Sequence, residues 1–223
     1  MKILDIFLSF PKTLWFNFNS MPFKDAIRFP IIVNWRTKFA SLKGKVTFTE
    51  PIHFGMLKIG FNGSMTAKYQ PSVIENNGTL IVGSHSYFGG GCQICTVAED
   101  SVLKIGNNCK FMGECHIVSS ESISFGDDCI VSWNTQIMDS DMHAIFDEYR
   151  RLKNPNNPVL VGDHVWICSG VSILKGTIVG SGTILSAGGV ITGRLDCNCV
   201  YTGMPLKKIL CKVEWGSSDF LKS

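Results

Sequence analysis

Apolar residues return at every sixth position along much of the chain. From residue 161 onward they occupy Val161, Ile167, Ile173, Val179, Leu185 and Ile191. The same spacing occurs upstream, at Val82, Phe88 and Ile94, at Ile105, Phe111 and Ile117 and, after a two-residue slip, at Phe125, Val131 and Ile137. A period of two indicates a half-buried strand and a period of 3.6 indicates a helix. A period of six fits neither for long, and it predicts very short strands joined by tight corners.

A small residue often stands four positions after the large one, as at Cys92, Cys109, Cys115 and Cys129. We expect the large side chain to fill the interior of a coil and the small one to fit where the corner narrows. Glycine often follows the large residue directly, where it relaxes the bend. Three such units close one turn of a parallel β-helix, and stacked turns bury a continuous core. The sequence therefore predicts an all-β fold of this kind.

The rhythm stops over the stretch MDSDMHAIFDEYRRLKNPNNP, residues 138–158. The step from Ile137 to Val161 is 24 residues, or four units of six, so the frame of the core is preserved across the break. This predicts one long loop over residues 138–160 that projects from the coil. Because catalytic groups concentrate on loops held by a rigid scaffold, His143 in this loop is a candidate functional residue.

The chain of 223 residues is long enough for one domain with extensions. We expect an N-terminal apolar arm over residues 1–45 with a short helix near residue 25, a β-helix domain over 46–210 whose regular coils run from about residue 80 to 202, and a C-terminal tail over 211–223. The arm has neither the ~18 apolar residues of a membrane span nor the pattern of a secretory signal. It is expected to pack against the domain or a neighbouring subunit. The alternative is a peripheral contact with a membrane through Phe7, Phe10, Trp15 and Phe16.

The composition of the chain indicates which partners and which cellular compartment to expect. The net charge of +3 is small and scattered, which gives no indication of nucleic-acid binding. Charged residues make up 17% of the chain, a low share that favours a covered surface, as in an oligomer. Nine cysteines without a secretory signal are expected to be reduced, four of them as small core residues. This predicts a cytoplasmic protein, at the inner face of the membrane if the arm makes contact there.

The repeats resemble those of the hexapeptide acyltransferases, whose domain is a left-handed parallel β-helix. The segments GDHVWICSGVSILKG and YTGMPLKKI look like the family's late coils and its closing Gly-x-Pro-x-Lys element. MDSDMH resembles the Asp-x-Asp-x-His of the bacterial polysaccharide O-acetyltransferases, and LWFNFNSMPFKDAIRFPIIV resembles the N-terminal segment of that branch. The resemblance covers residues 12 to 212 or so, and it supplies the handedness that the spacing leaves open.

The resemblance implies an acetyl-CoA-dependent O-acetyltransferase acting on a sugar hydroxyl of a bacterial surface polysaccharide (capsule or lipopolysaccharide) or of its precursor. His143 matches the family's catalytic histidine, and histidine suits a general base because it titrates near neutrality. A carboxylate would orient the ring, from Asp141 by preference or from Asp139. Two alternatives stay open, which are transfer to the nitrogen of a nucleotide-linked amino sugar and a non-catalytic scaffold.

The resemblance also assigns residues to acetyl-CoA as a co-substrate. Six positions match its donor site: Trp166, Ser169, Ala187, Thr192, Lys207 and Lys208. The first two match residues of the acyl-CoA groove, and Ala187 matches a position whose backbone meets the pantetheine arm. Thr192 matches a threonine near the distal part of the cofactor. Lys207 matches the residue that pairs with a phosphate of CoA, and Lys208 is expected to assist it.

The chain departs from the family pattern at two positions. Gly193 stands where a lysine is common, and Met112 stands where galactoside-type members have an acceptor asparagine. The γ-class carbonic anhydrases share this fold and bind zinc through histidines five residues apart, but no His-x4-His pair occurs here, so no metal is expected. The family usually forms homotrimers with active sites between subunits, and we expect the same of this chain, with a sugar or polysaccharide precursor as the acceptor.

Overall fold

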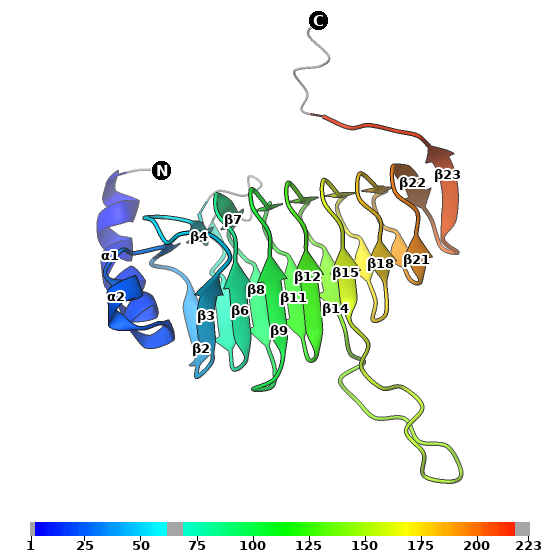
Figure 1. The fold of residues 1–223 in the computed structure, drawn as a ribbon, viewed down its shortest axis with the longest axis horizontal. Coiled ribbons are helices and arrows are strands. Elements are labelled where there is room, and N and C mark those ends of the chain that lie inside the picture. Colours follow the sequence, from blue (N-terminus) through cyan, green and yellow to red (C-terminus); the bar gives the residue numbers. More distant parts are fainter. Residues whose placement is uncertain (1–2, 62–68, 217–223) are drawn as a thin grey trace, which may run out of the picture.

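The structure is a computed structural model that describes residues 3–61 and 69–216. Its body is a prism of three sheets, in which each turn of the chain adds one short strand to every sheet (Figure 1). Sheet A contains β1 (Ile31–Val33), β4 (Leu57–Ile59), β7 (Ser86–Phe88), β10 (Lys110–Phe111), β13 (Ile130–Val131), β16 (Trp166–Ile167), β19 (Ile184–Leu185), β22 (Cys199–Thr202) and β23 (Lys207–Cys211). Every neighbouring pair in it is parallel except β22 with β23.

The other two sheets are parallel throughout. Sheet B contains β2 (Lys38–Leu42), β5 (Val73–Asn76), β8 (Gln93–Thr96), β11 (His116–Ser119), β14 (Gln136–Met138), β17 (Ser172–Ile173) and β20 (Val190–Ile191). Sheet C contains β3 (Lys45–Phe48), β6 (Thr79–Val82), β9 (Val102–Ile105), β12 (Ser122–Phe125), β15 (Val159–Val161), β18 (Ile178–Val179) and β21 (Arg194–Leu195). The chain turns between them at A–B, B–C and C–A corners.

The register of the strands confirms the six-residue period. Ile167 pairs with Leu185 one turn later, and Val161 pairs with Val179, so 18 residues close a regular turn. Ile137 pairs with Ile173, which keeps the core in frame on both sides of the long loop. All of these side chains are buried. The predicted parallel β-helix is therefore confirmed.

Cysteines fill the narrow corners of the prism, as the repeat predicts. Cys92, Cys109, Cys115 and Cys129 are all fully buried. The thiol of Cys109 lies 3.1 Å from the carbonyl oxygen of Gly126, and that of Cys129 lies 3.2 Å from that of Gly162. Each thiol thus donates a weak hydrogen bond to the next turn, and a larger side chain at these corners would displace that backbone.

The strands begin earlier than the repeat predicts. β1 pairs with β4, and β2 pairs with β5, so the prism starts at Ile31 and not at residue 46. The arm proper is α1 (Ile3–Ser20) followed by α2 (Phe23–Ala26), which is the short helix predicted near residue 25. At the other end, residues 212–216 of the predicted tail are described and residues 217–223 lie outside the described part. There the Trp215 indole stacks on His164 with ring centroids 4.0 Å apart.

Helix α1 closes the open edge of sheet A with polar side chains. Ser9 and Thr13 accept hydrogen bonds from the backbone N–H groups of Trp35 and Val33 at 3.0 Å, and the Asn17 amide donates to the carbonyl of Ile31 at 2.7 Å. Four helical residues rise about 6 Å and two strand residues about 6.6 Å, so the helix can satisfy every second residue of the strand. An edge strand that would otherwise template aggregation is thereby covered.

Phe16 corrects one sequence-based expectation. The alternative of a membrane contact included Phe16, whereas the structure buries this side chain completely in the core, as expected for an arm that packs against the domain. It lies on the side of α1 that faces the prism, next to Phe39 with ring centroids 5.8 Å apart. Phe7, Phe10 and Trp15 point outward and remain exposed. Among the described residues, no helix is long and apolar enough to cross a membrane.

Asn17→Ala is expected to destabilise the fold by about 1–3 kcal/mol, because it leaves the buried N–H and C=O groups of Ile31 without partners. Urea denaturation measures the change. Asn19→Ala is the matched control, since Asn19 lies on the same helix with an exposed side chain bonded only within α1, and its removal should stay within about 0.5 kcal/mol. Equal effects of the two substitutions would refute the edge-capping role.

Candidate active site

The predicted loop leaves the prism at the B–C corner after β14 and returns at β15 (Figure 1). It forms an irregular hairpin, joined by a single antiparallel bridge between Phe146 and Leu152. At its tip the Asp147 carboxylate accepts hydrogen bonds from the backbone of Tyr149 and from the backbone and guanidinium of Arg151. The base of the loop stays close to the coils, and it carries the DSDMH sequence.

His143 lies at the base of this loop and lines a cleft of 410 Å³. The cleft is bounded by the loop residues Ser140, Met142, Ala144 and Asn154 and by Val97, Ala98 and Ser120 at the B–C corner. The His143 ring is exposed and makes no hydrogen bond with any side chain in the described part of the chain. Met142 before it adopts φ +62°, a left-handed conformation that is uncommon for an unbranched bulky residue. The ring is therefore presented to the cleft and not used for packing.

The Asp139 carboxylate is hydrogen-bonded to the preceding turn of the coil. Its side chain is fully buried, and its carboxylate accepts hydrogen bonds from the backbone of Ser120 at 2.7 Å and of Glu121 at 2.9 Å and from the Ser119 hydroxyl at 3.2 Å. With its oxygens used in this way, Asp139 anchors the start of the loop to the preceding turn. The choice that the sequence leaves open, between Asp139 and Asp141, thus favours Asp141 as the carboxylate near the cleft.

Asp141 is held by two residues that lie outside the DSDMH motif, Lys175 and Asn154. Its carboxylate accepts hydrogen bonds from the Lys175 ammonium at 2.6 Å and from the Asn154 amide at 2.8 Å. The same Asn154 amide donates to the carbonyl of His143 at 2.8 Å, and its oxygen accepts from the backbone of Ile145. Asn154 therefore links Asp141 to the backbone that directly follows the histidine ring's attachment, at His143 and Ile145. In this structure the Asp141 carboxylate is connected to His143 through Asn154, and not by a hydrogen bond to the ring.

The Lys175 ammonium, followed by the Asn154 amide, holds the pKa of the Asp141 carboxyl below its ordinary value. A carboxyl whose pKa is lower in the folded state than in the unfolded state stabilises the fold above its unfolded pKa of about 3.9. That contribution is lost as the pH falls through the depressed pKa. The base of the loop thus keeps this ion pair throughout the neutral range.

Two of the donor-site candidates meet at the A–B corner. Ser169 and Ala187 occupy equivalent places in successive turns, and the Gly188 backbone donates to the Ser169 carbonyl at 3.0 Å. A Cβ atom built on Gly188 would meet no atom within 4 Å, so the backbone is open to solvent there. An extended ligand such as a pantetheine arm can approach such a bare backbone closely. The residues present at this corner therefore fit the acyl-CoA assignment.

The remaining donor-site candidates lie on other elements. Trp166 is in β16 on sheet A, with its ring 5.9 Å from that of Trp215. Thr192 follows β20 at the B–C corner, on the opposite side of sheet B from Ala187. Lys207 is exposed in β23 and its ammonium has no partner among the described residues, whereas Lys208 forms an ion pair with Asp196 at 2.8 Å. The two lysines thus differ, and Lys207 is the one free to meet a phosphate.

The other histidines serve the scaffold or face solvent. His85 and His164 occupy left-handed corner positions with φ of 58° and 53°, and His53 bonds the Ser84 hydroxyl at 2.7 Å. His116 is exposed on β11. In the described residues no group of three or more His, Cys, Asp or Glu side chains is placed to hold a metal ion.

Comparisons with known proteins agree with this architecture. No protein-family model matches the chain. Two solved structures, the polysialic acid-specific acetyltransferase NeuO and the polysialic acid O-acetyltransferase OatWY, share its fold with TM-scores of 0.55 and 0.60. Both are 23% identical to it, covering 85% and 82% of this chain and 86% and 89% of their own. The chain thus has the left-handed parallel β-helix of the hexapeptide-repeat acetyltransferases.

Sequence relatives narrow the class. The chain is 29% identical over 149 residues to the Escherichia coli protein named "Putative lipopolysaccharide biosynthesis O-acetyl transferase WbbJ", covering 62% of this chain and 75% of that protein. It is 28% identical over 135 residues to the Neisseria meningitidis polysialic acid O-acetyltransferase, covering 51% and 63%. The match thus spans less than two thirds of the second relative. The chain is thus similar in fold to the hexapeptide-repeat acetyltransferases and similar in sequence to proteins named as O-acetyltransferases.

Proposed function

We propose that the protein transfers an acetyl group from acetyl-CoA to a hydroxyl of a sugar in a surface polysaccharide or its precursor. The observation that carries the proposal is the presentation of His143, with its ring free, at a cleft between the loop and the coils. The names of the relatives, which refer to lipopolysaccharide and to polysialic acid, support an acceptor of this class.

His143 would act as the general base. Its ring takes the proton of the sugar hydroxyl as that oxygen bonds to the acyl carbon, and the protonated ring then returns the proton to the sulfur as the carbon–sulfur bond breaks. Protons and charge balance without a covalent enzyme intermediate. Asp141 stabilises the arrangement by holding Asn154, which fixes the backbone around the histidine. Lys175 completes this support from the next coil.

The acceptor would lie along the B–C corner. The cleft at His143 adjoins a second one of 520 Å³, and the two share Val97 and Ala98. The second cleft continues past Asn77 to Lys43 and Lys45 on the first turns of the prism. A groove that runs across several stacked turns is longer than one sugar ring. Its shape therefore favours an oligosaccharide or polymeric acceptor over a free monosaccharide.

We expect a homotrimer, and the exposed loop tip supports a contact between neighbouring subunits. It stands clear of the prism (Figure 1) and exposes Ile145, Phe146, Tyr149 and Leu152. Apolar side chains on a projecting hairpin are expected to be covered by a neighbour. With the loop of one subunit against the prism of the next, His143 and the bare A–B corner at Ser169 and Ala187 would come from different subunits. The active site would then lie between subunits.

Binding of CoA separates this proposal from a non-catalytic scaffold. A thermal-shift measurement with CoA at about 100 times its Kd should show a stabilisation of roughly 2.7 kcal/mol, because only the folded state binds. A scaffold predicts no shift at any CoA concentration. Adenosine without phosphates is the matched control ligand, and it should give a smaller shift because it lacks the groups that Lys207 would meet.

Lys207→Ala is expected to raise the KM for acetyl-CoA by about tenfold while leaving kcat near that of the wild type, because the lost contact is remote from the reacting atoms. Steady-state kinetics with each substrate varied in turn measures the effect. Lys212→Ala, at an exposed lysine beyond β23, is the matched control and should change neither constant. An unchanged donor KM in Lys207→Ala would assign the phosphate contact to another residue.

A further inference from the structure

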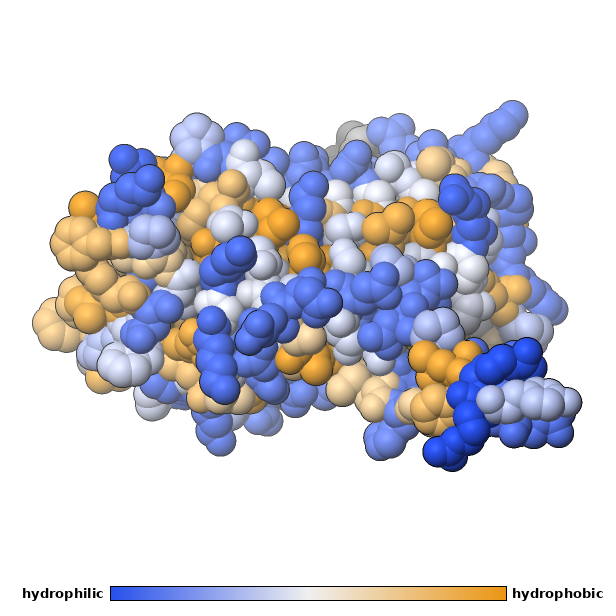
Figure 2. Space-filling view, turned by 60° about the horizontal axis from the view of Figure 1, so that its bottom comes forward, coloured by the Kyte–Doolittle hydropathy of each residue, from blue (hydrophilic) through white to orange (hydrophobic). Residues whose placement is uncertain are grey.

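Helix α1, which covers one end of the prism, has its polar and apolar faces in the opposite arrangement to most surface helices. Its face toward the core is mostly polar, whereas its face toward solvent is apolar. Six exposed residues define what we call the end patch: Phe7, Phe10, Leu14, Trp15 and Phe18 of α1 and Phe23 of α2. Phe7 is 82% exposed and Trp15 is 59% exposed. Figure 2 shows hydrophobic residues gathered at the left-hand end of the molecule, where Figure 1 places α1 and α2.

The end patch cannot turn inward. Ser9, Thr13 and Asn17 hold α1 to the edge of sheet A by hydrogen bonds, so a rotation of the helix would leave those backbone groups unpaired. The rings of Phe18 and Phe23 lie 5.6 Å apart and join α2 to the same surface. An apolar face fixed in this orientation on a folded domain marks a contact with another surface.

The charged residues around the end patch indicate which kind of surface it contacts. Lys24 follows Phe23 in α2 and Arg28 lies two residues after that helix; both are exposed, and Arg28 also donates to the carbonyl of Ile52 at 3.2 Å, while Asp5 and Asp25 are half-buried. Residues 3–61 contain eight Lys and Arg against three Asp and Glu, an excess of five, whereas the whole chain has a net charge of only +3. The capped end of the prism is thus its basic end. Aromatic side chains flanked by Lys and Arg are the composition of helices that lie in the headgroup layer of anionic membranes.

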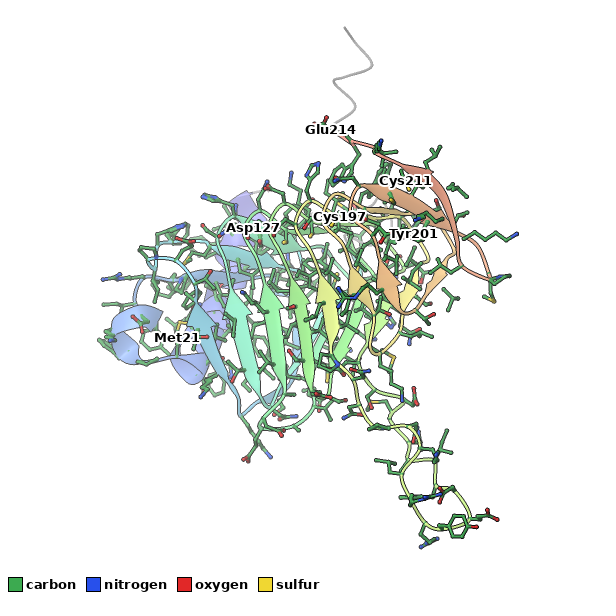
Figure 3. The ribbon with its side chains drawn as sticks, turned by 45° about the vertical axis from the view of Figure 1, so that its right-hand side comes forward. Met21, Asp127, Cys197, Tyr201, Cys211 and Glu214 are labelled. Carbon is green, nitrogen blue, oxygen red and sulfur yellow. The ribbon has the colours of Figure 1, made fainter. Side chains whose placement is uncertain are left out.

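We propose that the end patch seats the protein on the surface of an anionic phospholipid bilayer, with α1 lying in the interfacial layer. A second copy of the chain fits less well, because a two-fold contact through the patch would bring Lys24 and Arg28 near their own symmetry mates. The sides of the prism stay free for the proposed trimer, since the patch occupies its end. Figure 3 shows this separation, with Met21 near the cap and Tyr201 and Cys211 at the opposite end. The docking does not depend on acetyl transfer.

Vesicle sedimentation of the full chain tests the proposal. The wild type should partition onto vesicles of phosphatidylcholine with phosphatidylglycerol and much less onto phosphatidylcholine alone. The double variant Phe7→Ser, Trp15→Ser should lower the partition coefficient on anionic vesicles at least about tenfold, because it removes two side chains that insert. Lys24→Gln with Arg28→Gln should lower it roughly tenfold or more and weaken its dependence on salt.

Ile209→Ser is the matched control, since Ile209 is 52% exposed on β23 at the other end of the prism, and its binding should equal that of the wild type. Circular dichroism checks that each variant keeps its fold. Wild-type protein that stays in the supernatant with anionic vesicles would overturn the proposal, as would full binding by the Phe7→Ser, Trp15→Ser variant. Light scattering that shows patch-dependent pairing of particles without lipid binding would overturn it in favour of a second copy.

Discussion

His143→Ala is expected to lower kcat for acetyl transfer by roughly 10²–10⁴-fold, the usual contribution of a positioned general base. The fold should be unaffected, because the ring is exposed and makes no side-chain hydrogen bond in the described part of the chain. The KM for acetyl-CoA should stay near the wild-type value, since the substitution removes an interaction made in the transition state. Steady-state kinetics and a thermal denaturation curve measure these effects together.

The matched control for this variant is His116→Ala. His116 is also an exposed histidine, but it lies on β11 outside the cleft, so its replacement should change kcat by less than about twofold. Near wild-type turnover by the His143 variant would remove the general base from the account. Loss of activity together with unfolding would show that His143 stabilises the loop. That result would contradict the account, which treats the exposed ring as free of any structural role.

Phe111→Ala is expected to destabilise the fold by about 3–5 kcal/mol, which would be the largest effect of a single core substitution that the structure indicates. The Phe111 ring stacks on Phe88 with centroids 4.2 Å apart and meets the Phe125 ring edge-on at 5.1 Å. All three side chains are fully buried in the middle of the prism. Removing the central ring leaves a cavity that stiff stacked turns cannot close.

Chemical denaturation at a fixed protein concentration measures that loss. Phe111→Leu keeps most of the volume and should cost about 1–1.5 kcal/mol, so the two substitutions distinguish a cavity from a change of shape. Phe54→Ala, at a phenylalanine that is 70% exposed, should stay within about 0.5 kcal/mol. A loss below 1 kcal/mol for Phe111→Ala would contradict the continuous core on which the fold depends.

The period of six was sufficient to predict the prism, because each turn repeats the same requirement for one large and one small side chain. It located Phe111 and Cys109 in the interior and preserved the frame from Ile137 to Val161 across the loop. The period did not predict the first turns of the prism. Before residue 80 the repeat is irregular, so the first turns looked like separate strands although they pair in the same sheets.

Helix α1 reversed the usual expectation from sequence. Apolar residues normally mark the buried face of a helix, but on α1 Phe7 and Trp15 are exposed and only Phe16 among these three is buried. The neighbour of α1 is an edge strand with unpaired backbone groups, so polar residues at Ser9, Thr13 and Asn17 face inward. The surface against which a helix packs depends on the tertiary structure, and the sequence pattern of the helix alone does not predict it.

The candidate site could be predicted only in part, because some of its contacts join residues that are far apart in the sequence. The DSDMH motif singled out His143 and two aspartates, but only the structure separates the buried Asp139 from Asp141. Lys175 lies 34 residues after the aspartate that it holds, and Asn154 lies 13 residues after it. They meet because stacked corners bring distant residues together, and no short motif records such contacts.

Transfer of a labelled acetyl group tests the central claim most directly. The wild-type protein is incubated with acetyl-CoA labelled in the acetyl group and with oligosaccharide fragments of capsules and lipopolysaccharides, and the label in the sugar is followed. The account predicts an alkali-labile acetyl ester on one class of fragment, formed by the wild type and His116→Ala but not by His143→Ala. Label that resists alkali would indicate transfer to nitrogen, and equal labelling by wild type and the His143 variant would contradict the proposed mechanism.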